Sequence, residues 1–405
     1  LYSLGVILYW MLGGRLPFQA SDPLGWVHCH LARTPAPLTE VAPGLPPAIS
    51  DIVSRLLAKP PEDRYQSARG LAHDLHRCLS EWQATGWVEP FQPGEHDVAD
   101  RLRIPRRLYG REREVRELLQ AYERVVATGS AEILLVSGYS GIGKSSLVQE
   151  LYEPVVRSRG FFGSGKFEQY RRDIPYSTLI QAFQKLVLAI LAESEPRIAA
   201  FRLRLLRALG VNAQLIVEVI PPIELVIGRQ APVPELLPTE AQNRFRITFR
   251  QFVQVFAREE HPLALFLDDL HWADSASLDL LEELVTHPDL RHLLVIGAYR
   301  DNEVSPAHPL MLTLDEVRRA GIPVSNIVLG PIPREQLAAF VGEALHYPAA
   351  GAAPLAELIH EKTAGNPFFA IHFLTALHEE RLIEFEARAG AFRWDVARIR
   401  AKAFT

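Results

Sequence analysis

The stretch GYSGIGKSS, from Gly138 to Ser146, contains residue types suited to holding phosphate groups. It satisfies the spacing G-x-x-x-x-G-K-[ST]. Gly138, Gly141 and Gly143 let the backbone approach phosphate oxygens closely and adopt positive φ, which turns N–H groups inward as an anion-binding nest. The stretch therefore predicts a phosphate-binding loop.

The next residues of the loop carry the chemistry that a nucleotide requires. Lys144 supplies a positive charge for the β- and γ-phosphates, and Ser145 offers a hydroxyl to Mg²⁺. Ser146, the next residue, is also a candidate nucleotide-binding residue. The following helix adds about half a positive charge at its N-terminus. A glycine-rich turn with a chance Lys-Ser pair is the alternative. The apolar strand before the loop and the helix after it argue against that alternative.

A second candidate, LALFLDDLHWAD, is an apolar strand that ends in two carboxylates. We predict that Asp268 holds Mg²⁺ through water and that Asp269, the catalytic residue, polarises the attacking water. Neighbouring residues of a strand point in different directions, so only one of the two can face the metal. The alternative is a strand that ends in a polar turn, which the upstream loop makes the weaker interpretation.

Two further positions are open to a structural explanation. Arg300 ends the strand LLVIGAYR and could sense the γ-phosphate, although an ordinary surface arginine explains it nearly as well. The tripeptide GNP, which ends at Pro367, lies between two helical patterns. Its residues alone indicate only a helix C-cap followed by a helix start.

The elements that must position these residues are short apolar strands separated by helical patterns. This alternation predicts an α/β fold with a parallel sheet. A helix is expected at 111–127, more helices at 331–385 and a hairpin in RLIEFEARAGAFRW. The expected strands are EILLVSG and the segments 263–269, 293–300 and 324–330.

Five ordered segments resemble the landmarks of AAA-type, STAND-class P-loop ATPases: LYGREREVRELL, GYSGIGKSSLV, FLDDLHWADSASLDLL, GAYRDNEV and GNPFF. The resemblance implies an ATPase core at 108–330, a helical lid at 331–380 and the start of a winged helix at 381–405. It further implies that Tyr109, Gly110 and Arg111 lie near adenine, that Pro367 packs on the base, and that Arg300 is the first sensor. No residue matches the arginine finger convincingly, so the resemblance supports ATP binding more strongly than hydrolysis.

Residues 1–82 read as helices joined by proline-rich turns. LYSLGVILYWMLGGRLPF and LLAKPPEDRYQSARGLAHDL resemble the end of a eukaryotic-type Ser/Thr protein kinase C-lobe. Helix 1–12 is apolar nearly all round, which predicts burial on all sides in a complete lobe and partial exposure in this chain. Arg64 matches the kinase arginine that pairs with an upstream glutamate, so it is expected to lack that partner here. Residues 83–107 are the expected linker, and we expect the chain to be a fragment.

Composition excludes several classes of protein. The chain has 405 residues, a net charge of −5 and only two cysteines, Cys29 and Cys78. Two cysteines cannot build a disulfide framework or a zinc cluster, which indicates a reducing, cytoplasmic compartment. No apolar run reaches the roughly 18–20 residues that a membrane helix needs. The acidic balance argues against a dedicated nucleic-acid binder.

The order of the segments resembles large bacterial hybrid kinases, which combine a Ser/Thr kinase, an ATPase module, a GAF domain and a sensor histidine kinase. We therefore expect a signal-transduction module that binds and slowly hydrolyses Mg-ATP as a regulatory switch. Its expected partners are ATP and flanking kinase and sensor domains, and the sequence also allows a homo-oligomer. One alternative is a DNA-associated ATPase of origin-recognition or transcription-regulator type. Another is a competent Ser/Thr kinase, which fits the parent protein only, because the catalytic loop is not in this chain.

Overall fold

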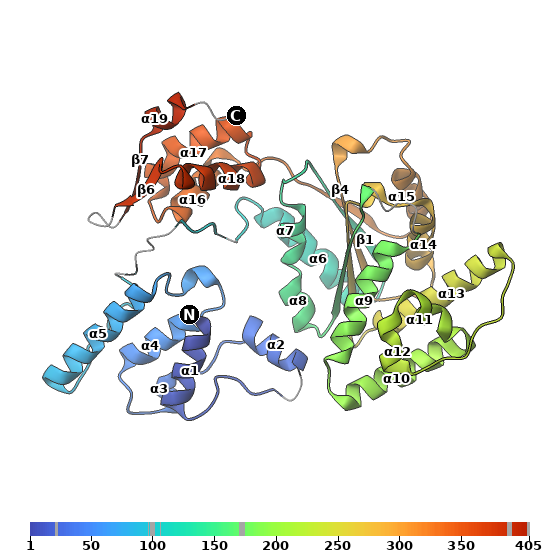
Figure 1. Ribbon diagram of the computed structural model, residues 1–405, viewed down its shortest axis with the longest axis horizontal. Helices are drawn as coiled ribbons and strands as arrows, with labels where there is room; N and C mark the ends of the chain where they lie inside the picture. Colours follow the sequence, from blue (N-terminus) through green and yellow to red (C-terminus); the bar gives the residue numbers. More distant parts are fainter. Residues whose placement is uncertain are drawn as a thin grey trace. The chain divides into compact units, whose positions relative to one another are not determined.

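The computed structural model describes residues 1–20, 23–95, 97, 102–105, 107–169, 175–386 and 391–402 (Figure 1). The chain divides into two compact units. The first, here called the helical unit, comprises Leu1–Ser21, Gly25–Gly110 and Pro331–Thr405; the second, the sheet unit, comprises Asp22–Leu24 and Arg111–Gly330. No helix among the described residues combines the length and the apolar character of a membrane span.

The sheet unit is built on five parallel strands in the order β2-β3-β4-β1-β5. The three central strands are apolar nearly throughout and almost wholly buried, as expected for a parallel sheet with both faces covered. Their carboxyl ends meet at one edge, where Lys166 of β2 pairs with Asp268 of β3. The strands are β1 (Glu132–Ser137), β2 (Phe161–Lys166), β3 (Leu263–Asp268), β4 (Leu293–Tyr299) and β5 (Val324–Val328).

Strand β2 is the one strand of this sheet that the sequence analysis did not predict. Its sequence, FFGSGK, contains two glycines, which are poor strand formers. Packing explains them. A Cβ atom on Gly165 would lie 2.4 Å from the carbonyl oxygen of Thr178, and one on Gly163 would lie 3.3 Å from the side chain of Leu186; both residues belong to the helix Ser177–Leu191. The glycines therefore let a helix approach the strand closely.

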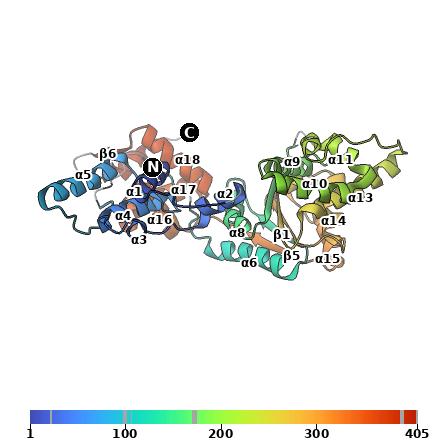
Figure 2. The same cartoon turned by 90° about the horizontal axis from the view of Figure 1, so that it is seen from below.

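Helices cover both faces of the sheet, with α6 and α9 on opposite faces (Figure 2). Helices α9 to α13 separate β2 from β3 in the sequence and lie together (Figure 1). The helices are α6 (Glu112–Thr128), α7 (Lys144–Gln149), α8 (Tyr152–Arg157), α9 (Ser177–Leu191), α10 (Glu195–Leu209), α11 (Ala213–Val219), α12 (Glu224–Ile227), α13 (Pro238–Phe256), α14 (Ser275–Thr286) and α15 (Pro309–Arg319). Short 3-10 turns are η3 (Gly210–Asn212), η4 (Pro221–Ile223), η5 (Leu270–Trp272) and η6 (Asp301–Glu303).

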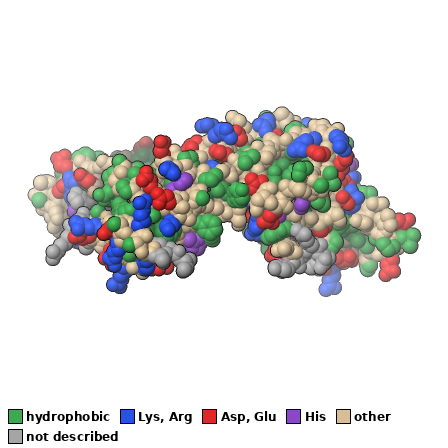
Figure 3. All heavy atoms as spheres, turned by 90° about the horizontal axis from the view of Figure 1, so that it is seen from above, with side chains coloured by type: hydrophobic (Ala, Val, Ile, Leu, Met, Phe, Trp, Pro, Cys, Tyr) green, Lys and Arg blue, Asp and Glu red, His purple; other side chains and the backbone are tan. Residues whose placement is uncertain are grey.

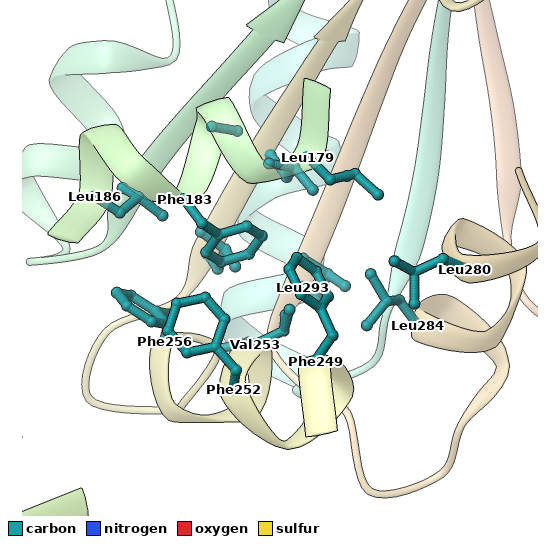
Figure 4. Close-up of a cluster of buried hydrophobic side chains, with 14 of the residues drawn as sticks. Leu179, Phe183, Leu186, Phe249, Phe252, Val253, Phe256, Leu280, Leu284 and Leu293 are labelled. Atoms are coloured by element: carbon teal, nitrogen blue, oxygen red, sulfur yellow. The ribbon is translucent and has the colours of Figure 1, made fainter. Parts of the chain in front are cut away.

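The core of the sheet unit is rich in aromatic side chains. Phe183 of α9 packs against three phenylalanines of α13, Phe249, Phe252 and Phe256, with ring centroids 5.3–5.6 Å apart (Figure 4). All four side chains are completely buried. Rings at these separations add to the stabilisation that burial alone provides.

The first part of the helical unit is a small helical cluster. Its elements are α1 (Tyr2–Gly13), α2 (Pro23–Ala32), α3 (Leu38–Val41), α4 (Pro47–Leu56), η1 (Pro61–Asp63) and α5 (Ala68–Thr85). Only Gly5 and Tyr9 of α1 are buried, whereas Trp10 and Met11 are 56% and 70% exposed. The partial exposure predicted for this helix is confirmed.

Arg64 was predicted to lack the carboxylate that pairs with it in a kinase lobe, and its observed contacts are of another kind. Its Nε donates to the carbonyl oxygen of Ala58 at 2.7 Å, and a terminal nitrogen donates to that of Lys59 at 2.8 Å. The guanidinium also lies 4.7 Å from the ring centroid of Tyr2. Carbonyl oxygens and an aromatic face thus take the place of the expected carboxylate.

The C-terminal part of the helical unit contains α16 (Arg334–Ala344), α17 (Ala349–Thr363), α18 (Pro367–Glu379), β6 (Ile383–Glu386), β7 (Ala391–Trp394) and α19 (Val396–Ala401). Strands β6 and β7 pair in antiparallel fashion, which confirms the predicted hairpin. The winged-helix assignment for 381–405 stays a prediction.

Side chains of both charge signs are scattered over the face shown in Figure 3, with hydrophobic side chains between them.

Candidate nucleotide-binding site

The predicted phosphate loop connects β1 to α7. Gly138, Gly141 and Gly143 have φ values of 146°, 75° and 100°, in the region that favours glycine. A Cβ atom on Gly138 would lie 2.6 Å from the carbonyl oxygen of Leu329. At these positions glycine is required by the backbone conformation and, at Gly138, by the space around it.

Lys144 begins α7 and is almost fully buried. Its ammonium group donates to the carbonyl oxygens of Gly138 at 2.7 Å and Tyr139 at 2.9 Å. Burial lowers the pKa of Lys144, and the nearby carboxylates of Asp268 and Asp269 oppose that shift. The lysine is thus held inside the loop by neutral carbonyl groups.

The loop and strand β3 meet at Ser145 and Asp268. The hydroxyl of Ser145 donates to Oδ2 of Asp268 at 2.9 Å, and Oδ1 of Asp268 accepts from the backbone N–H of Asp269 at 2.9 Å. A hydroxyl beside a carboxylate is a ligand pair that suits Mg²⁺, which usually takes its remaining ligands from water and substrate phosphates. No group of three or more His, Cys, Asp or Glu side chains in the described part of the chain could hold a metal by itself. Ser146, the next residue, is exposed.

Asp269 points elsewhere and has different partners. It adopts a left-handed backbone conformation with φ 51°, and it is only 5% exposed. Its Oδ2 lies 3.2 Å from Nζ of Lys166, and its Oδ1 lies 3.7 Å from Nε of Arg300. The two carboxylates therefore differ in surroundings: Asp268 faces a hydroxyl, and Asp269 lies between two cations.

Arg300 follows β4 and is held on a second side. One of its terminal nitrogens lies 2.6 Å from Oε1 of Glu303, and its guanidinium carbon lies 5.1 Å from the ring centroid of Trp272. The other oxygen of Glu303 is 3.2 Å from Nε2 of His271, a buried residue whose pKa is lowered by burial. Glu303 thus connects Arg300 to His271.

The sequence analysis missed three of these side chains: Lys166, His271 and Glu303. Lys166 ends a strand that was not predicted, so its alignment with Asp268 could not be inferred. Glu303 lies three residues after Arg300, and that spacing is the one signal in the sequence that could have suggested an ion pair.

The residues predicted to lie near adenine are divided between the units. Arg111, in the sheet unit, is buried and donates to the carbonyl oxygen of Gly330. Tyr109, in the helical unit, is buried against Phe340 of α16, with ring centroids 5.5 Å apart. Gly110, with φ 65°, also belongs to the helical unit, as does Pro367, the first residue of α18. Their role at the base stays a prediction.

Residues 107–296 match the family model described as the AAA ATPase domain. The matched segment contains the phosphate loop, the two carboxylates at the end of β3, three of the five parallel strands and the first residues of β4. This part of the chain is an AAA ATPase domain with the P-loop fold.

Similar proteins include kinases from several organisms. The hybrid signal transduction histidine kinase G of Dictyostelium discoideum is 32% identical, over 100% of this chain and 14% of its own length. The serine/threonine-protein kinase Pkn1 of Myxococcus xanthus is 41% identical over 81 residues, which are 20% of this chain and 12% of the relative. The chain therefore spans only a small part of these curated relatives. Among solved structures, the ORC2 protein of Aeropyrum pernix matches with a TM-score of 0.41 and 14% identity, over 67% of this chain and 62% of that one.

Proposed function

We propose that this chain is the ATP-binding signal-transduction module of a multidomain Ser/Thr or hybrid sensor protein kinase. It binds Mg-ATP and hydrolyses it slowly, as a switch that controls the flanking kinase and sensor domains. The observation that carries the proposal is the arrangement after β3. Asp268 contacts Ser145 of the phosphate loop, and Asp269 lies between Lys166 and Arg300.

Each side chain has a distinct part in this proposal. Lys144 and the glycine loop bind the phosphates, and Ser145 and Asp268 hold Mg²⁺. The ion, when bound, neutralises phosphate charge. Asp269 orients the attacking water and accepts its proton. Arg300 contacts the γ-phosphate as the first sensor.

Arg300 also supplies a way for nucleotide to change the protein. Its present contacts are two carboxylates, Asp269 and Glu303. A γ-phosphate is a further anion that competes with them for the same guanidinium. Binding and loss of that phosphate would therefore alter the contacts at the end of β4, which is the local event that a switch needs.

The kinase context rests on the first helices and on the names of the relatives. Residues 1–82 are proposed to be the end of a Ser/Thr kinase C-lobe, which agrees with the exposed apolar face of α1. Relatives named as hybrid histidine kinases and Ser/Thr kinases support a parent protein of this type. A homo-oligomer and a cytoplasmic location belong to the same proposal.

Nucleotide binding is tested by calorimetric titration of the full chain with Mg-ATP. Lys144→Ala removes a charge-assisted phosphate contact, and we expect affinity to fall about ten- to a hundredfold. Lys362→Ala, which removes an exposed lysine of α17, is the matched control and should bind like the wild type. Equal affinities for wild type and Lys144→Ala would contradict the proposed site.

The roles of the two carboxylates are tested by two substitutions that remove one charge each. Asp269→Asn should retain ATP while slowing phosphate production by about 10²–10⁴-fold, the usual contribution of a general base. Asp268→Asn should weaken magnesium-dependent binding itself. Bound nucleotide is measured by filter retention and released phosphate over hours. Equal losses of binding in both variants would refute this division, and a wild type that binds ATP without releasing phosphate would refute the hydrolysis.

A further inference from the structure

A groove of about 240 Å³ opens beside the Ser145–Asp268 pair. It is lined by residues of α7, the edge strand β2, β3 and α9, of which α7 and α9 are labelled in Figure 1. Six of its lining residues are polar: Ser145, Gln149, Ser164, Lys166, Lys185 and Asp268. Ser145 and Asp268 belong to the proposed magnesium site, whereas the proposed function gives no role to Gln149, Ser164 or Lys185.

The two lysines give the groove a graded charge. Lys166 lies 3.2 Å from Asp269, the residue proposed to activate water, and this end of the groove is here called the inner end. Lys185 donates to the carbonyl oxygen of Ser164 at 3.0 Å and to its hydroxyl at 3.3 Å. Ser164 lies two residues before Lys166 on β2, and this end is here called the outer end. Because these partners are neutral, they orient the ammonium group without cancelling its charge.

The sequence uses lysine sparingly in this unit. Between residues 111 and 330 it contains only three lysines, and basic positions elsewhere in the segment are arginines. One is Lys144 of the phosphate loop, and the other two, Lys166 and Lys185, both line the groove. Lysine is a compact point charge that binds phosphate without the planar fork of arginine. The distribution favours an anion, of phosphate type, as the ligand of the groove.

We propose that the groove binds inorganic phosphate released by ATP hydrolysis at the adjacent site. In that reaction a water oxygen bonds to the γ-phosphorus and the bond to the β-phosphate oxygen breaks, which leaves ADP and phosphate. Lys166 touches both Asp269 and the groove, so it stands where the product leaves the reacting position. The carboxylate of Asp268 repels an anion close to it and favours a position beside Lys185 and Ser164. This inference rests on the proposed ATPase function.

The test measures binding of radiolabelled orthophosphate to the full chain saturated with Mg-ADP. Lys185→Met removes the outer charge, and we expect phosphate affinity to fall roughly three- to tenfold. Lys185→Arg keeps the charge and should retain most of the affinity, which also reports that the fold tolerates a change at this position. Arg157→Met is the control, because Arg157 is an exposed cation of α8 that pairs with Glu153 at 2.6 Å.

The outcomes separate this inference from the proposed function. Equal phosphate affinities for wild type and Lys185→Met, or no binding by the wild type, would refute the groove even if ATP binds as proposed. Absence of ATP binding in a separate titration would refute the proposed function whatever the phosphate result. A wild type that prefers a phosphoserine peptide to orthophosphate would overturn the assignment of the ligand as the reaction product.

Discussion

Strand β4 of the sheet unit and helix α1 of the helical unit have similarly apolar sequences and opposite surroundings. Every residue of β4, LLVIGAY, is buried. In α1, YSLGVILYWMLG, only Gly5 and Tyr9 are buried, and large side chains such as Trp10 and Met11 face solvent. An apolar sequence therefore indicates that an element tends to be buried. The packing of neighbouring elements decides whether its side chains are in fact removed from solvent.

The helical cluster of residues 1–85 nevertheless contains a buried carboxylate with specific hydrogen-bond partners. The buried carboxylate of Asp74 accepts from the hydroxyl of Tyr65 at 2.5 Å and from the backbone N–H of Gly94 at 2.6 Å. Burial and this carboxylate together raise the pKa of Tyr65 far above its ordinary value. Exposure of α1 thus coexists with specific polar packing elsewhere in the cluster.

The largest effect that would sharpen the contrast is expected in the aromatic core of the sheet unit. Phe252→Ala removes a completely buried ring that packs on Phe183 and Phe256. The free energy of unfolding should fall by about 3–5 kcal/mol, because a cavity remains. Urea denaturation measures it. Leu203→Ala, at a position 66% exposed on α10, is the control and should change stability by less than about 0.5 kcal/mol.

A smaller effect is expected at the polar interior of the helical cluster. Asp74→Ala leaves the hydroxyl of Tyr65 and the N–H of Gly94 without their acceptor, which should cost about 1–3 kcal/mol. Hydrogen exchange of the α5 amides reports the loss locally. Asp51→Ala, at an exposed position of α4, should leave that exchange unchanged. Equal exchange in both variants would mean that the Asp74 network contributes nothing to the cluster.

The smallest effect is expected on α1. Trp10→Ser should change the free energy of unfolding by about 1 kcal/mol or less, because more than half of the side chain is already exposed. It should also lower self-association of the chain, since an exposed apolar surface promotes contact between copies. Sedimentation and thermal unfolding measure the two quantities. A loss of stability comparable to that of Phe252→Ala would break the contrast between the two regions.

Local patterns were sufficient to predict much of the sheet. Strands β1, β3 and β4 are compact apolar runs, β5 is a shorter run of valine and isoleucine around two polar residues, and the phosphate loop is defined by spacing alone. Strand β2 was not predicted, because glycine has a low strand propensity. Gly163 and Gly165 are present because α9 packs closely against the strand, and this tertiary requirement overrides the propensity.

The candidate site shows the same limit. Ser145 and Asp268 were both named from their motifs, and the structure brings them together. The contact of Lys166 with Asp269 depends on β2 lying beside β3, and the order of strands is not encoded in any local window. Arg64 likewise satisfied its charge with carbonyl oxygens that no motif would indicate.

The hydrogen bond from Arg111 to the carbonyl oxygen of Gly330 joins the first and last residues of the main segment of the sheet unit. The ends of this segment are therefore no farther apart than the reach of one side chain. For the chain on either side, the whole segment occupies the place of a surface loop, because a loop whose ends already touch costs little further entropy to close. Ends that lie this close together are the geometry that insertion of one domain into another chain requires.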